Sequence, residues 1–223
     1  MALAQLAVFV RAPKPGSTKT RLAEALGAEA AAALYEAFVD DTLSVCEQVR
    51  DSLPVDVAIW HAGPADEHVR EWAARVDGFA RAQPEGTLGK RLGAAFADGL
   101  DRYERVLVIG SDAPTLPATH LVDALGALAG SRLVLGPTSD GGYYTVGASK
   151  GARPTFEGVR WSTSHAFADT RAANSGIEFY ETAPWYDVDE MRDLDLLRAH
   201  LSLDPGAAPA TAARLEELSH KYG

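Results

Sequence analysis

The sequence has 223 residues, 47% of them hydrophobic and 23% charged, which is typical of a soluble globular protein with a sizeable core. Asp and Glu outnumber Lys and Arg by 31 to 21, and the resulting formal net charge of −10 argues against nucleic acid or an acidic membrane surface as a partner. The single cysteine, Cys46, allows no internal disulfide, and the lack of a membrane-length apolar run or a leader-like N-terminus predicts a cytoplasmic protein.

Short aliphatic runs alternate along the chain with longer segments of helical periodicity. In chain order, the pattern predicts a strand at 6–10, a helix at 28–49, a strand at 55–61, helices at 67–76 and 88–103, a strand at 105–111, a helix at 118–130 and strands at 132–137 and 143–148. The run "VLVIG" is apolar on both faces, as expected of a central parallel strand covered by helices. We therefore expect an α/β fold with a mostly parallel central sheet flanked by helices. It would form a single domain over residues 1–223, with a C-terminal linker and short helix at 202–223.

The stretch "RAPKPGSTKTRL", residues 11–22, follows the first predicted strand and contains the glycine, lysine and threonine of a phosphate-binding loop. It is not a Walker loop, because Pro13 and Thr18 stand where the pattern G-x-x-x-x-G-K-[ST] requires glycine. What remains is a Pro/Gly turn with Lys14, Lys19 and Arg21 near the start of a helix. Such a loop is often no more than a solvated turn, but it also suits a small phosphorylated ligand.

Acidic residues stand at three further places beside predicted elements. Asp112 follows the strand at 105–111, Asp140 follows the strand at 132–137, and Asp187 and Asp189 come just before a helix. Because ligands of open α/β sheets bind beyond the carboxyl ends of the strands, these groups should converge on one edge. Each has an ordinary explanation as a helix cap, a turn or an acidic helix start. Together with the basic loop they suit a metal–triphosphate site, since Mg²⁺ is held by one or two carboxylates plus phosphates.

Six motifs occur in the order of a known family, between about residues 7 and 198: "RAPKPGSTKTRL", "QPEGTLGKR", "GSDAPTL", "GPTSDGGYY", "FEGVRWST" and "DVDEMRDL". They resemble the nucleotide-diphospho-sugar transferase superfamily, which has a Rossmann-like glycosyltransferase-A fold. Within it, they resemble a bacterial glycosyltransferase-like family that includes proteins named for arsenosugar biosynthesis. The Lys-[ST]-Arg-Leu segment is more distantly similar to the guanylyltransferases of deazaflavin cofactor synthesis. The departures from the family pattern are Arg11 for a leading Lys and Glu190 for a frequent Thr.

The resemblance implies a role for each motif. Nucleotide binding would involve Arg11, Ala12, Pro13, Lys14, Gly16, Lys19, Arg21, Gln83, Gly86, Leu88, Gly89, Arg91 and Ser111. The carboxylates that would hold Mg²⁺ or Mn²⁺ are Asp112 and Asp189, with Asp187 as a further candidate. A second substrate would face Asp140, Gly141, Gly142, Tyr143, Trp161, Ser162 and Thr163, although Trp161 is equally well explained as a core residue. The catalytic groups would be Lys19, Arg21, Asp112 and Asp140.

Two reactions suit this set of residues, both with a small-molecule nucleotide donor. In a nucleotidyltransferase, a phosphate or phosphonate on a small acceptor would attack a nucleoside triphosphate and release pyrophosphate, with Lys19, Arg21 and the metal ion neutralising charge. A glycosyltransferase would move a sugar from a nucleotide sugar, and an inverting enzyme would need Asp140 as a base. The basic loop, and a lone Asp112 in place of Asp-x-Asp, favour nucleotidyl transfer. A non-catalytic nucleotide-binding protein would not need both Asp112 and Asp189.

Overall fold

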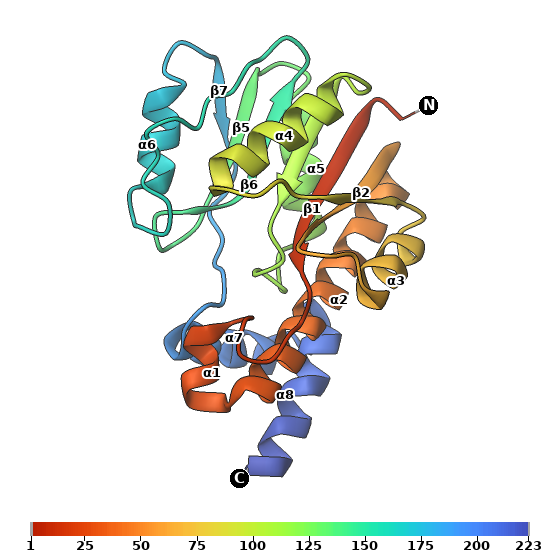
Figure 1. Ribbon diagram of the computed structural model, residues 1–223, viewed down its shortest axis with the longest axis vertical. Coiled ribbons are helices and arrows are strands. Elements are labelled where there is room, and N and C mark those ends of the chain that lie inside the picture. Colours follow the sequence, from red (N-terminus) through yellow and green to blue (C-terminus); the bar gives the residue numbers. More distant parts are fainter. Residues whose placement is uncertain (1, 223) are drawn as a thin grey trace.

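A seven-stranded sheet forms the centre of the computed structural model, which describes residues 2–222 (Figure 1). The strand order is β3-β2-β1-β4-β6-β5-β7. The strands are β1 (Ala4–Arg11), β2 (Val55–Ala62), β3 (Phe79–Ala82), β4 (Arg105–Ile109), β5 (Leu133–Pro137), β6 (Tyr143–Ser149) and β7 (Phe179–Glu181). The predicted α/β fold with a mostly parallel sheet is confirmed, and each of the five predicted strands is present.

The sheet is parallel except at β6, which runs antiparallel to both of its neighbours, β4 and β5. The cause is local: residues 138–142 connect β5 to β6 by a short turn, and strands joined in this way must pair antiparallel. Strands β3 and β7 were not predicted. They have four and three residues, and none of these is buried, so they lack the apolar pattern of the central strands.

Eight helices in the described part of the chain surround the sheet. They are α1 (Thr20–Leu26), α2 (Ala28–Ser52), α3 (Glu67–Arg75), α4 (Leu88–Leu100), α5 (Ala118–Ala127), α6 (Ala166–Ala173), α7 (Met191–Leu203) and α8 (Pro209–Tyr222). Figure 1 shows α1, α7 and α8 together beneath the sheet, at the end where β1 finishes. None of the described helices is both long enough and apolar enough to span a bilayer.

The core lies on both faces of the sheet, and β1 shows why. Leu6, Val8 and Val10 belong to one buried cluster, which α2, α3, α5 and α7 cover. Ala7 and the partly buried Phe9 belong to the cluster on the opposite face, beneath α4. Side chains alternate across a strand, so a strand buried on both faces is apolar along most of its length; in β1 the buried Gln5 is the exception. The same rule explains "VLVIG" in β4.

The stretch at 202–211, predicted as a linker, contains the end of α7, a short 3-10 turn at Pro205–Ala207 and the first residues of α8. Helix α8 packs against α2. Asp41 of α2 is 2% exposed and accepts hydrogen bonds from the backbone amides of Ala210 and Thr211 at 3.0 and 2.8 Å. Cys46, also on α2, is a buried free thiol whose pKa burial raises to about 12.

Candidate active site

Thr18, which was not among the predicted site residues, holds the loop after β1 in a folded conformation. Thr18 is only 1% exposed. Its Oγ1 donates to the carbonyl of Ala12 at 3.0 Å and accepts from the amide of Lys14 at 3.3 Å. Gly16 has φ +78°, which glycine adopts without strain. Lys19 then begins α1 in the left-handed conformation, with φ 49° and ψ 49°.

Lys19 lies between the two carboxylates that were predicted to hold a metal ion. Its Nζ is 2.6 Å from Asp112 Oδ1 and 2.6 Å from Asp189 Oδ1, and it donates to the carbonyl of Val188 at 2.7 Å. The side chain of Lys19 is 4% exposed, whereas those of Asp112 and Asp189 are 46% and 44% exposed. Burial alone lowers the pKa of Lys19, but the two carboxylates outweigh it and hold that pKa above its ordinary value. The ammonium is therefore charged at neutral pH.

Two backbone features place the carboxylates around Lys19. The amide of Val188 donates to the carbonyl of Asp112 at 2.8 Å, which ties the segment before α7 to the end of β4. Asp193 Oδ2 accepts from the amides of Asp189 and Glu190 at 3.1 and 2.8 Å, as part of a capping box at the start of α7. The start of α7, where the acidic residues suggested the beginning of a helix, therefore holds the backbone of Asp189 in place.

Asp187 and Asp140 lie near this cluster but do not pair with Lys19. Burial, followed by the charges of Asp140 and Asp189, raises the pKa of Asp187 to about 7. Asp140 Oδ1 accepts from Thr138 Oγ1 at 2.5 Å and from the amide of Gly142 at 2.8 Å, so this carboxylate closes the turn between β5 and β6.

Gly141 is required in that turn. Its φ is +88°, and a Cβ there would lie 2.3 Å from the carbonyl oxygen of Ser164. The turn and the segment at residue 164 are therefore in backbone contact, which brings the predicted second-substrate motifs together.

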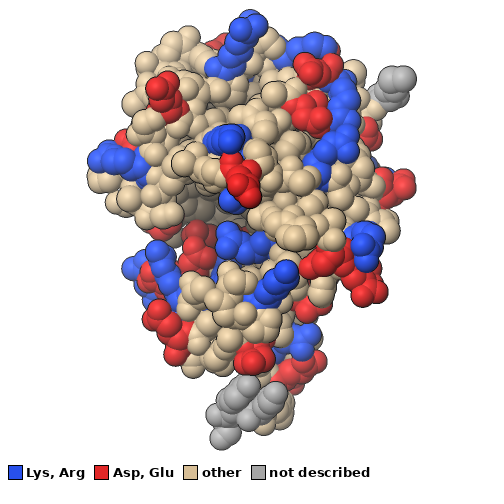
Figure 2. All heavy atoms as spheres, viewed as in Figure 1, with Lys and Arg blue, Asp and Glu red and all other residues tan. Residues whose placement is uncertain are grey.

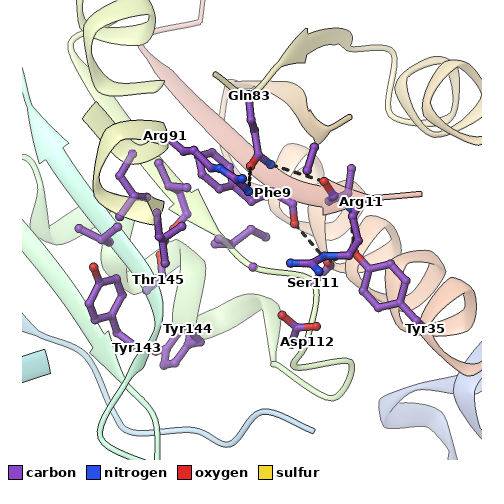
Figure 3. Close-up of a pocket in the computed structure, with 18 residues that line it drawn as sticks. Phe9, Arg11, Tyr35, Gln83, Arg91, Ser111, Asp112, Tyr143, Tyr144 and Thr145 are labelled. Atoms are coloured by element: carbon purple, nitrogen blue, oxygen red, sulfur yellow. Dashed lines mark hydrogen bonds between the residues drawn. The ribbon is translucent and has the colours of Figure 1, made fainter. Parts of the chain in front are cut away.

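A cavity of about 240 Å³ opens beside the cluster, at the carboxyl ends of β1 and β4 (Figure 3). Its lining includes Arg11, Asp112, Gln83, Arg91 and Tyr143. A second, more polar hollow of about 320 Å³ adjoins it and is lined by the loop residues 17–21, together with Arg11 and Asp112. Figure 2 shows the surface hollowed here, with both charge signs at its rim. One continuous cleft thus connects the basic loop to an apolar pocket.

Only some residues of the motif "QPEGTLGKR", residues 83–91, line this cleft. Leu88 and Arg91, at the start of α4, line the apolar cavity. Gly86, in the preceding loop, has φ +121°. Gly89 allows close packing, since a Cβ there would lie 2.8 Å from Phe156 Cβ. This contact gives Gly89 a structural role, and the nucleotide contacts of both glycines stay predictions.

The remaining second-substrate candidates divide between cleft and core. Tyr143 lines the apolar cavity and packs edge-on against Trp161, with ring centroids 6.2 Å apart. Trp161 also contacts Phe156, consistent with the core interpretation. Ser162 lines the polar hollow with φ +59°. Thr163 Oγ1 donates to the carbonyl of Arg160 at 2.7 Å and stabilises a local turn.

Two further observations concern the rim of the cleft. Arg21 is 59% exposed in its side chain, pairs with Glu190 at 3.2 Å and lines the polar hollow together with Lys19 and Asp189. Tyr35 of α2 was not predicted: its hydroxyl accepts from the amide of Arg11 at 3.1 Å and lies 2.8 Å from Ser111 Oγ. Nothing distinguishes Tyr35 from the apolar face of its helix in sequence, so only the fold reveals it.

The chemistry of Asp112 and Asp189 suits a divalent cation. Both present hard carboxylate oxygens to a single positive charge, and both are nearly half exposed, so phosphate oxygens and water have access. Among the described residues, no three His, Cys, Asp or Glu side chains converge as a ready set of metal ligands. The pair therefore fits an ion that arrives with its own phosphate ligands rather than an all-protein cage.

The fold and the comparison with a solved structure place the chain in the nucleotide-diphospho-sugar transferase superfamily. The chain is 31% identical to a proposed nucleotide-diphospho-sugar transferase from Desulfovibrio desulfuricans G20, with a TM-score of 0.85 over 100% of this chain and 99% of that one. It belongs to the family described as uncharacterized protein conserved in bacteria (DUF2064), which matches residues 42–163. No curated protein sequence matches it.

More distant structures share the fold alone. A cytidylyltransferase from Leptospira borgpetersenii is 12% identical, with a TM-score of 0.58 over 99% of this chain and 95% of that one. The 4-diphosphocytidyl-2C-methyl-D-erythritol synthase from Anaerococcus prevotii is 10% identical, with a TM-score of 0.56 over 90% of this chain and 99% of that one.

Proposed function

We propose that the protein is a nucleotide-dependent transferase that moves a nucleotidyl group from a nucleoside triphosphate to a small acceptor bearing a phosphate or phosphonate, with release of pyrophosphate. The observation that carries the proposal is the buried Lys19 between Asp112 and Asp189, in a polar hollow that Arg11 also lines. These groups offer both charge signs beside a pocket large enough for part of a nucleotide. The similarity to a proposed nucleotide-diphospho-sugar transferase supports the use of a nucleotide donor.

Catalysis in this proposal depends on position and charge, not on a protein nucleophile. A phosphate acceptor is already ionised near neutral pH, so it needs no general base. Asp140 fits a positioning role, because one of its oxygens is committed to the turn before β6. Lys19 and Arg11 are placed to bind phosphate oxygens, where charge-assisted contacts are strong.

Asp112 and Asp189 are the residues that would hold Mg²⁺ or Mn²⁺. Such an ion supplies positive charge that neutralises the phosphate oxygens as they react. Lys19 holds the two carboxylates in the free protein, and we propose that its ammonium turns to a phosphate when the donor binds. In this proposal, Lys19 lies between Asp112 and Asp189 because the same carboxylates bind the ammonium before the donor arrives and the metal ion afterwards.

Glycosyl transfer from a nucleotide sugar is the second candidate, favoured by the description of the 31% identical relative. A thermal-shift panel of nucleoside triphosphates and nucleotide sugars, each with Mg²⁺ or Mn²⁺, separates the two. A ligand at 100 times its Kd adds about 2.7 kcal/mol of stability, so the preferred donor should be obvious. We expect a triphosphate to stabilise most. A preference for a nucleotide sugar would replace nucleotidyl with glycosyl transfer, and stabilisation by neither class would contradict both.

A further inference from the structure

The crevice between β1 and β4 opens where the two strands stop pairing. Their ladder ends at Val8 and Ile109. Beyond it, β1 stays paired with β2 as far as Arg11, whereas the amide of Gly110 donates to the carbonyl of Tyr144 in β6. The order of the sheet also reverses here, since β2 and β3 lie on one side of β1 and β4 lies on the other. Ligands of open α/β sheets bind at such a switch point, so contacts other than the ladder must set the separation of the two strand ends.

A chain of three hydrogen bonds crosses this crevice, with the hydroxyl of Tyr35 in its middle. The amide of Arg11 donates to Tyr35 Oη at 3.1 Å, and Tyr35 Oη lies 2.8 Å from Ser111 Oγ. Ser111 Oγ in turn donates to the carbonyl of Phe9 at 3.1 Å. A serine hydroxyl has one hydrogen, and the carbonyl takes it, so Tyr35 must be the donor to Ser111. The direction of every bond in the chain is therefore fixed.

Tyr35 connects three elements that carry residues of the candidate site. It belongs to α2, Arg11 ends β1, and Ser111 immediately precedes Asp112. Tyr35 lines both the apolar cavity and the polar hollow, so it lies where the two join. Figure 3 shows Arg11, Tyr35 and Ser111 together at one side of the cavity, with Asp112 next to Ser111.

The environment of Tyr35 keeps this chain intact at neutral pH. Tyr35 and Ser111 are 3% and 2% exposed, so their hydrogen bonds are shielded from solvent. Burial, followed by the charge of Asp112, raises the pKa of Tyr35 to about 12. The phenol therefore keeps its proton and can donate it to Ser111.

We propose that Tyr35 is a positioning residue that fixes the separation between Arg11, as a phosphate ligand, and Asp112, as a metal ligand, a role that rests on the proposed function. A metal–nucleotide complex is held at both places at once, and Mg²⁺ keeps its oxygen ligands at about 2.0–2.1 Å in near-octahedral geometry. The spacing of the two residues must therefore match the ligand closely. Setting that spacing before the ligand arrives avoids the cost of ordering the site during binding.

Ser111 has a defined place in this proposal. It was predicted from the sequence to bind the nucleotide, but its one hydroxyl hydrogen is already donated to Phe9. Ser111 then serves the site by linking Tyr35 to the residue that precedes Asp112.

The alternative is that Tyr35 only stabilises the fold. Loss of its hydrogen bonds would then lower the melting temperature, and binding with and without metal would weaken alike. A positioning role predicts a different pattern, because only a ligand that contacts both Arg11 and Asp112 depends on their separation. A nucleotide without metal contacts the basic groups alone.

The test is isothermal titration of the parent and its variants with ATP, CTP, GTP, UTP and the matching nucleotide sugars, each in Mg²⁺ and in EDTA. The measured quantity is the metal coupling ratio, which is the Kd of a nucleotide in EDTA divided by its Kd in Mg²⁺. For the nucleotide that binds the parent most tightly, Tyr35→Phe should lower this ratio roughly tenfold, which is within the range for residues that interact directly. Its Kd in EDTA should change less than about threefold.

Two further variants make the test specific. Ser111→Ala breaks the same chain and should lower the coupling ratio in the same direction, so it serves if Tyr35→Phe does not fold. Tyr103→Phe is the matched control, because Tyr103 is 9% exposed and donates to Asp56 at 2.8 Å, but precedes β4 at the amino end of that strand, away from the cleft. Tyr103→Phe should keep the parent ratio even if it melts at a lower temperature.

A double variant shows whether Tyr35 acts through Asp112. Asp112→Asn should itself lower the coupling ratio, and adding Tyr35→Phe should then lower it much less than it does in the parent. Equal effects of Tyr35→Phe in the two backgrounds would overturn the proposal. So would an unchanged ratio in both Tyr35→Phe and Ser111→Ala, or an equal fall in Tyr103→Phe. Binding of no nucleotide of either class, or a parent affinity that does not depend on Mg²⁺, contradicts the proposed function itself, so the two failures are distinguishable.

Discussion

Replacing Lys19 with methionine tests the central contact of the candidate site. The change keeps the length and the apolar stem of a side chain that is 4% exposed, and it removes the ammonium shared by Asp112 and Asp189. The two carboxylate oxygens each lie 2.6 Å from the ammonium nitrogen and so are at most 5.2 Å apart. Without the ammonium they would repel each other by at least about 0.8 kcal/mol in water and about 3 kcal/mol at the effective dielectric of a protein surface. Because both carboxylates are nearly half exposed, we expect a loss of unfolding free energy of about 1–3 kcal/mol, below the 3–5 kcal/mol typical of breaking a fully buried pair.

The assay is urea unfolding followed by tryptophan fluorescence, with and without Mn²⁺. In the parent, an ion must compete with Lys19 for the carboxylates, so Mn²⁺ alone should stabilise it little. In Lys19→Met the pair is free, and at ten times the Kd of the ion the variant should regain about 1.4 kcal/mol. Lys14→Met is the matched control, because Lys14 is exposed in the same loop and has no ion pair among the described residues. If Lys19→Met and Lys14→Met unfold at the same urea concentration and respond equally to Mn²⁺, the reasoning about this cluster is refuted.

Three further changes address the metal ligands, the reaction and the pH dependence. Asp112→Asn removes charge with little change of shape, so metal-dependent nucleotide binding should be lost while the fold stays stable; titrations showing parent affinity would contradict the assignment. Asp140→Asn should raise the KM of the acceptor more than it lowers kcat, and a hundredfold fall in kcat at unchanged KM would favour glycosyl transfer with Asp140 as base. His120 lies on α5, where burial lowers its pKa, so protonating it costs more in the folded than in the unfolded protein. The unfolding free energy is therefore fully retained above the unfolded pKa of 6.5 and falls as the pH drops below it. The unfolding free energy of the parent minus that of His120→Gln should therefore shrink between about pH 8 and about pH 5.5, and a constant difference would exclude this cause.

The central strands could be predicted from the sequence, because strands that are buried on both faces appear as runs of apolar residues. β1 and β4 are covered on both faces, so their buried residues are apolar with the single exception of Gln5 in β1. β3 and β7 are short, with no buried residue, and leave no such pattern. The antiparallel direction of β6 depends on the turn at 138–142. The pattern of apolar residues locates the strands but does not show the direction in which they pair.

The location of the candidate site could be predicted from the sequence, but the contacts among its residues could not. The rule that ligands lie beyond strand ends was enough to expect Lys19, Asp112 and Asp189 on one edge, and the structure brings them together. That Lys19 lies between the carboxylates follows from the left-handed backbone at the start of α1 and from the link between Val188 and Asp112. Neither feature has a sequence signature. The roles of these residues in binding and catalysis stay predictions, as do the links to arsenosugar and deazaflavin chemistry.

The contact between Lys19 and Asp189 joins residues 170 positions apart, and this separation sets an order of events during synthesis. At 5–20 residues per second, Asp189 emerges from a ribosome about 10 to 35 seconds after Lys19. Strands β1 to β6 all lie within residues 4–149, so the sheet can assemble around β1 during that interval, with only β7 missing. Lys19 then has Asp112 as its partner, and the second carboxylate arrives with the start of α7. The cleft is therefore completed only after the segment that precedes α7 has been made, when strands β1 to β6 are already available to pair.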